Sequence, residues 1–172
     1  GGAYAPENKA GLAGLTHGLL DTGAGELDEE KIADRLADIG ARLGGSVDQD
    51  RASISLRSLS SAREREAALE LMRLVLQQPM FPAAALEREK ARSIAGIREA
   101  DTRPGSIAAK RFAAALYPGH PYGRLPTVES VEKITRDDLL AFYRAHYGAR
   151  RAVVSIIGDL GRAEAEAIAQ RL

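Results

Sequence analysis

The most informative stretch of the sequence is GLAGLTHGLLDTGAG, residues 11–25. Leu12, Leu15 and Leu19 follow the spacing i, i+3, i+7, so they form one apolar stripe on a helix. The pattern predicts a helix over residues 9–20, and the run DTGAG at residues 21–25 ends it. The rest of the chain is expected to pack around the face that this stripe presents.

A second face of the same helix carries Gly14, His17 and Gly18 at the spacing i, i+3, i+4. Glycine inside a helix costs roughly 1 kcal/mol relative to alanine, so glycines on both sides of a histidine need a reason. The spacing is that of the inverted zinc motif His-x-x-Glu-His, in which two histidines one turn apart bind zinc and the glutamate activates water. Gly14 stands at the first histidine, His17 at the glutamate and Gly18 at the second histidine.

Four further runs accompany this degenerate motif, in the order PMFPAAALEREK at 79–90, HPYG at 120–123, ITRDDLLAFYRAHY at 134–147 and VVSIIGDL at 153–160. Together with the motif helix, they resemble the insulinase/pitrilysin family of zinc peptidases, including its processing-peptidase type. The likeness extends over nearly the whole chain. It implies a non-catalytic member in which the metal site has been lost.

The resemblance implies an α+β fold, a mostly antiparallel sheet with helices packed on one side, as in the first homologous domain of that family. We expect residues 1–172 to form a single insulinase-like domain. Family members have another strand or two before the motif helix, and the final helix stops abruptly. The domain is therefore expected to be trimmed at both ends.

Local patterns predict the elements of this fold. Asp28 is the expected N-cap of a second helix that Gly44 and Gly45 end, followed by strands at 46–49 and 51–59. Helices are predicted at 62–77, 83–100 and 104–117, and from a capping box at Thr135 and Asp138 to about residue 147. The apolar run at 151–157 predicts a central strand buried on both faces, before a last helix at 161–172. The charged run 87–90 predicts a solvated helix face.

The third zinc ligand of the family is a glutamate on a later helix. The run ALEREKARSIAGI places it on Gly96, and a shift of three residues would place it on Glu99. A catalytic zinc site needs three protein ligands and a water, and glycine offers no donor. We therefore expect no zinc cofactor and no catalytic residue in this chain. The degenerate positions of the lost site are Gly14, His17, Gly18 and Gly96. Zinc is expected in an active homologous partner.

The same degenerate helix leaves two structural interpretations open. Gly11, Gly14 and Gly18 share a face, which favours close approach of another backbone or helix. Alternatively, the face is a relic that tolerates many residues because it no longer binds metal. A lone histidine between glycines, His17, is more often a satisfied polar group than a ligand.

Composition excludes several classes of function. The formal net charge is zero, which gives no basis for binding nucleic acid. The sequence has no apolar run long enough to span a membrane and no cysteine for disulfides or cysteine-based metal sites. The absence of cysteine leaves the compartment open, and exported bacterial relatives make a periplasmic setting an expectation from resemblance alone.

The resemblance implies a function as well. We expect a non-catalytic, peptidase-like domain that pairs with an active zinc peptidase subunit or domain of the same family and helps enclose a peptide or unfolded polypeptide. The matching peptide-binding strand edge is expected at Ser46, Val47 and Asp48. One alternative is a structural or assembly subunit that handles no peptide. A second is an active zinc metalloendopeptidase, which would need ligands from a partner or from other segments.

Overall fold

The structure, a computed structural model, describes all 172 residues and divides them into two compact units. The first unit contains Gly1–Leu19, Ser46–Ser53 and Phe81–His146, and the second contains Leu20–Gly45, Ile54–Met80 and Tyr147–Leu172. The α-helices are α1 (Leu12–Gly18), α2 (Glu29–Asp38), α3 (Ala62–Gln77), α4 (Ala83–Ala100), α5 (Pro104–Leu116), α6 (Val128–Glu132), α7 (Arg136–His146) and α8 (Arg162–Arg171). The strands are β1 (Gly23–Ala24), β2 (Leu27–Asp28), β3 (Arg42–Val47) and β4 (Ala52–Arg57), and short 3-10 helices η1 to η4 cover Gly2–Tyr4, Glu7–Lys9, Pro121–Gly123 and Ala149–Arg151.

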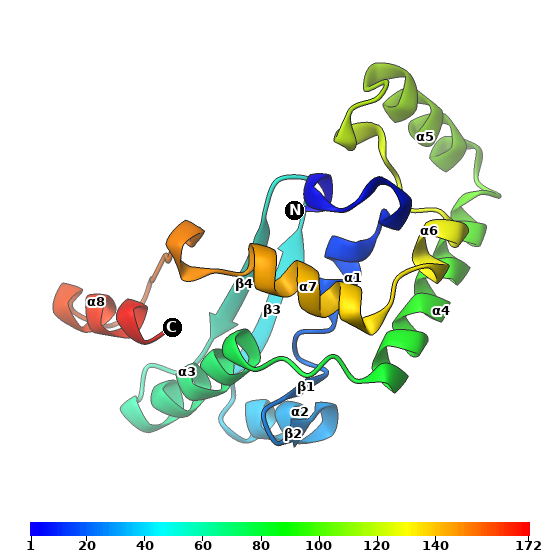
Figure 1. The fold of residues 1–172 in the computed structure, drawn as a ribbon. Helices are drawn as coiled ribbons and strands as arrows, with labels where there is room; N and C mark the ends of the chain where they lie inside the picture. Colours follow the sequence, from blue (N-terminus) through cyan, green and yellow to red (C-terminus); the bar gives the residue numbers. More distant parts are fainter. The chain divides into compact units, whose positions relative to one another are not determined.

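The first unit is built around α1, which packs against α7 and α4, while α4 packs against α6 (Figure 1). The predicted stripe of Leu12, Leu15 and Leu19 is confirmed, because all three side chains are buried. The helix is shorter than expected, since it begins only after Gly11. Gly11 is its N-cap, and a φ of 102° there is readily adopted only by glycine.

The predicted capping box at the start of α7 is present and is tied to a distant residue. The Thr135 N–H donates to Asp138 Oδ2 at 2.8 Å, and the Asp138 N–H donates to Thr135 Oγ1 at 3.3 Å. Lys9 Nζ also donates to Asp138 Oδ1 at 2.5 Å. Burial alone raises the pKa of Asp138, but the hydrogen bonds from Lys9 and Thr135 and the Lys9 charge outweigh it, so the pKa lies below the ordinary 3.8.

The lowered pKa gives Asp138 a stabilising contribution that depends on pH. A carboxyl group with a lowered folded-state pKa stabilises the fold above its unfolded-state pKa and loses that contribution as pH falls through the folded-state value. We expect Asp138→Asn to flatten the fall in unfolding free energy between about pH 5 and pH 2, measured by urea denaturation. Asp137→Asn removes the same charge from the same turn and should leave the wild-type slope. An equally steep slope in both variants would contradict this assignment.

The second unit contains α3, with α8 against it, and the short β1–β2 sheet with α2. Strand β1 pairs antiparallel with β2. The Gly23 oxygen of β1 also accepts a hydrogen bond from the Met80 N–H at 2.8 Å. Asp28 caps α2 as predicted, because its Oδ1 accepts the Lys31 N–H at 2.9 Å. Gly25, with a φ of 57°, allows the turn that returns the chain to β2.

Helix α3 has the predicted bounds and buries Ala68, Leu71 and Val75 as predicted. Helix α8 is held against it by Ile168, which is buried, and by Arg171, which pairs with Glu66. The last helix of the chain is therefore anchored within the second unit.

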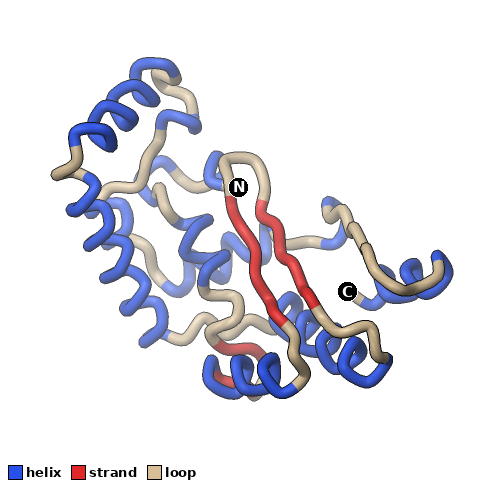
Figure 2. The backbone as a smooth tube through the Cα atoms, turned by 180° about the vertical axis from the view of Figure 1, so that it is seen from behind, coloured by secondary structure: helices blue, strands red, loops and turns tan.

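The other two strands, β3 and β4, form a hairpin (Figure 2). Its turn is closed by Asp48, whose N–H donates to the Arg51 oxygen at 3.0 Å and whose Oδ1 accepts the Asp50 N–H at 2.8 Å. The prediction that Gly44 and Gly45 end the second helix was wrong. That helix ends at Asp38, and both glycines lie inside β3.

The α+β class is confirmed, but helices dominate. The strands form two separate two-stranded sheets, so the structure does not contain one sheet with helices on one side. The prediction of a buried central strand at 151–157 was also wrong. The segment lies outside every strand, and Val153 and Ile157 are 96% and 97% exposed.

Candidate functional site

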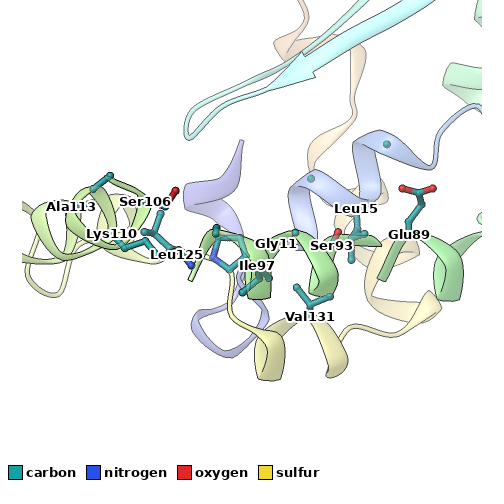
Figure 3. Close-up of a pocket in the computed structure, with 16 residues that line it drawn as sticks. Gly11, Leu15, Glu89, Ser93, Ile97, Ser106, Lys110, Ala113, Leu125 and Val131 are labelled. Carbon is teal, nitrogen blue, oxygen red and sulfur yellow. The ribbon is translucent and has the colours of Figure 1, made fainter. Parts of the chain in front are cut away.

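Three of the four degenerate motif positions line one pocket of the first unit. Gly14 and Gly18 come from α1, and Gly96 comes from α4. The pocket has a volume of about 720 Å³, and α5 and the segment around Leu125 complete its wall. In Figure 3, Leu15, Ser93 and Glu89 lie toward one end of the pocket and Ser106, Lys110 and Ala113 lie toward the other. The folded chain therefore brings together positions that are far apart in sequence.

The glycines of this pocket face open space. A Cβ atom built on Gly14, Gly18 or Gly96 meets nothing within 4 Å. The interpretation that Gly14 and Gly18 allow close helix approach was therefore wrong. Gly11 differs, because a Cβ there would lie 3.4 Å from Val131 Cγ2 and its positive φ disfavours any other residue.

Neither remaining candidate donor lines the pocket. His17, the residue at the position of the catalytic glutamate, lies half-buried on the last turn of α1. Glu99, the alternative third ligand, is exposed on α4, and its Oε1 lies 3.3 Å from Arg103 Nη2. The two residues that could supply donors for a partial metal site therefore lie outside the residues that line this pocket.

The charged side chains that do line the pocket are Glu89 and Lys110, and both form ion pairs. Glu89 Oε1 lies 3.1 Å from Arg92 Nη1 and 3.5 Å from Arg88 Nε, and Lys110 Nζ lies 2.7 Å from Asp101 Oδ1. The remaining wall is mostly small and apolar. The pocket thus offers one carboxylate and one ammonium group, each engaged in an ion pair.

Sequence reasoning missed Glu89 because it assigned the charged run 87–90 to a solvated face. Glu89 is only 20% exposed, and the neighbouring Lys90 donates from Nζ to the Glu132 and Ile134 oxygens at 2.9 and 3.1 Å. The sequence did contain a signal that Glu89 lies on the same side as Gly96, because Glu89 precedes Gly96 by seven residues. That separation is two helical turns, so both residues share one face of α4.

The zinc that the resemblance implies for active relatives does not fit these residues. No group of three or more His, Cys, Asp or Glu side chains in the structure could hold a metal ion. A catalytic zinc site takes three such donors, and here the three aligned positions are glycines.

The predicted peptide-binding edge, Ser46, Val47 and Asp48, lies at the end of β3 and the start of the hairpin turn. Ser46 Oγ lies 2.9 Å from Ser53 Oγ on β4. The Asp48 oxygen accepts the Gly2 N–H at 2.8 Å, so the N-terminal segment covers that part of the edge. Because the Asp48 N–H points to Arg51 and N–H directions alternate along a strand, the Val47 N–H points away from β4.

The other two histidines have structural surroundings. His120 Nδ1 accepts the Tyr122 N–H at 3.2 Å at the start of η3. The His146 ring lies against the Phe142 ring, with centroids 4.4 Å apart, in the last turn of α7.

Comparison with known proteins identifies the family. Residues 1–126, most of the chain, match the family model described as insulinase, peptidase family M16. The chain belongs to the M16 family. Residues 133–172 match a second model of the family, described as the peptidase M16 inactive domain. The resemblance predicted from the sequence is confirmed.

Three M16 relatives illustrate the similarity. A crystal structure of a peptidase M16 inactive domain from Pseudomonas fluorescens matches with a TM-score of 0.90 and 37% identity, over 95% of this chain and 40% of that one. The non-peptidase homolog YmxG of Helicobacter pylori is 26% identical over 93% of this chain and 37% of its own length. A probable mitochondrial-processing peptidase subunit beta of Schizosaccharomyces pombe is 28% identical over 60% of this chain and 23% of its own length.

This M16 chain thus spans well under half the length of each of these relatives. No helix in the structure combines the length and the apolar character that a membrane span requires.

Proposed function

We propose that residues 1–172 act as one non-catalytic M16 domain that pairs with an active, zinc-bearing M16 subunit or domain. The observation that carries this proposal is the pocket at the degenerate motif. Gly14, Gly18 and Gly96, the positions to which the family resemblance assigns zinc ligands, line its wall together. The similarity to a non-peptidase homolog and to a processing-peptidase subunit supports the same role.

The direct test measures peptide cleavage by an M16 chain with an intact His-x-x-Glu-His motif, alone and after addition of this chain. We expect this chain to bind the active chain and to raise its rate of cleavage of a fluorogenic peptide. Binding without a change in rate would favour a structural or assembly subunit over a helper. Cleavage by this chain alone, sensitive to a zinc chelator, would overturn the proposal.

We also propose that the domain helps to hold the peptide through the edge of β3. Peptides can add as a strand to an exposed sheet edge, where main-chain hydrogen bonds supply the affinity. The Val47 N–H, directed away from β4, is the donor that this edge offers next to Ser46. The Asp48 oxygen is already bonded to Gly2, so we place the peptide contact at Ser46 and Val47.

Substitution at Val47 tests this contact. Proline has no N–H, and one lost backbone hydrogen bond of about 1 kcal/mol corresponds to about a fivefold change in affinity. We expect Val47→Pro to weaken binding of a fluorescein-labelled extended peptide about fivefold, measured by anisotropy. Val47→Ala keeps the N–H and should bind nearly as wild type. Equal affinity of Val47→Pro and wild type would rule out this edge.

A further inference from the structure

The three glycines that line the pocket at the degenerate motif have no packing reason to be glycine. Gly14, Gly18 and Gly96 lie within helices, and none of them has a positive φ. A Cβ atom built on any of them meets nothing within 4 Å, so no neighbouring group of the chain requires the side chain to be absent. Each glycine nevertheless destabilises its helix relative to alanine. The chain therefore loses helix stability at three positions without gaining a packing contact there.

A relic face that merely tolerates many residues does not account for this pattern. Glycine makes up 17 of the 172 residues, so glycine at all three positions is expected by chance roughly one time in a thousand. The zinc motif selects these positions independently of the residues that stand there. In the fold they line one pocket, two from α1 and the third from α4. The common effect of the three glycines is free volume in that pocket.

The wall of the pocket indicates what this volume holds. Glu89 and Lys110 are the charged residues that line it; they lie toward opposite ends (Figure 3), and each forms an ion pair. The wall between them is uncharged and mostly apolar, with Leu15, Ile97 and Val131 among its larger side chains. A charged group placed there would lose its hydration without gaining an opposite charge, whereas an apolar group is stabilised by leaving water. The wall therefore favours an uncharged, apolar occupant.

We propose that this pocket takes a large apolar side chain of the peptide that the domain helps to hold, in the space that the resemblance assigns to zinc and its ligands. The inference rests on the peptide-holding function proposed above. The volume of about 720 Å³ suffices, because pockets of roughly 300–1,000 Å³ hold whole small ligands. Val47 of the β3 edge belongs to the same unit as the pocket. The edge supplies main-chain hydrogen bonds to any sequence, and the pocket selects phenylalanine or leucine at one position of the peptide.

A set of peptides tests this selection on the wild-type chain. Each is labelled with fluorescein and consists of alternating serine and threonine, with phenylalanine, alanine or glutamate at its centre. We expect the phenylalanine peptide to bind about tenfold more tightly than the alanine peptide, measured by anisotropy, because a large apolar side chain leaves water. The glutamate peptide should bind no more tightly than the alanine peptide.

Filling the pocket tests where the selection arises. Gly96→Leu adds an apolar side chain to the wall from α4, where a Cβ atom has open space. We expect this variant to bind the phenylalanine peptide only as tightly as the wild type binds the alanine peptide. Gly105→Leu is the matched control, because Gly105 is also helical and open around its Cβ atom but does not line the pocket. It should keep the tenfold preference, and urea denaturation shows whether both variants fold.

Three results would overturn the proposal, and they differ in what they leave of the proposed function. Equal affinity of the wild type for the phenylalanine and alanine peptides would show that the pocket takes no peptide side chain, while peptide holding at the β3 edge would stand. A preference that persists in folded Gly96→Leu would place the apolar site outside this pocket. Absence of binding to every peptide would remove the peptide-holding function itself.

Discussion

The variant that combines Gly14→His, Gly18→His and Gly96→Glu is expected to bind about one zinc ion per chain, whereas the wild type binds none. The three positions line one pocket, and a Cβ atom added at each of them meets nothing within 4 Å. Histidines four residues apart lie on one face of α1, the arrangement that zinc sites on helices use. Zinc binding is measured by isothermal titration calorimetry with zinc chloride.

The matched control replaces the same three glycines by alanine. Each Gly→Ala change inside a helix stabilises the fold by up to roughly 1 kcal/mol. This control should therefore unfold at a higher urea concentration than the wild type, and it should still bind no zinc. It separates the gain in helix stability from metal binding. A folded His/His/Glu variant that binds no zinc would show that these positions do not correspond to the family's ligands.

Phe81→Ala is expected to lower the free energy of unfolding by about 4 kcal/mol. Phe81 is fully buried, and its ring packs edge-on against Tyr143 with centroids 5.9 Å apart. Its φ of 47° is rare for a bulky residue, and its oxygen accepts the Arg136 Nε–H at 2.9 Å. The buried ring and this hydrogen bond hold the backbone in that conformation.

Phe112→Ala is the control for this prediction. Phe112 is 67% exposed on α5, so its loss should change stability by less than about 0.5 kcal/mol. Both changes are measured by urea denaturation of the whole chain. Similar losses of unfolding free energy at the two positions would contradict the assignment of Phe81 to the core.

Much of the helical framework follows from local sequence. The bounds of α3 and α4 were predicted at every end, and so were the cap at Asp28 and the box at Thr135. Caps and helical periodicity involve residues three or four apart, so the sequence displays them directly. The pocket positions Gly14, Gly18 and Gly96 were found through the family motif, because a glycine by itself carries no chemical signal.

The remaining features depend on residues that are distant in sequence. Local pattern alone cannot distinguish a strand buried on both faces from the exposed run that contains Val153 and Ile157, because burial depends on what pairs with it. The bond from Gly2 to the Asp48 oxygen covers part of a predicted binding edge and joins residues far apart along the chain. The role of Lys90 as a donor to the Ile134 oxygen has the same origin.

The zinc content of the purified wild-type chain shows directly whether the chain has lost its metal site. The chain is dialysed against a slight excess of zinc, free metal is removed, and bound zinc is measured by inductively coupled plasma mass spectrometry. An M16 chain with an intact His-x-x-Glu-His motif, treated identically, is the positive control. We expect near-zero zinc for this chain. About one tightly bound zinc ion per chain would contradict this expectation and would restore the interpretation of an active peptidase.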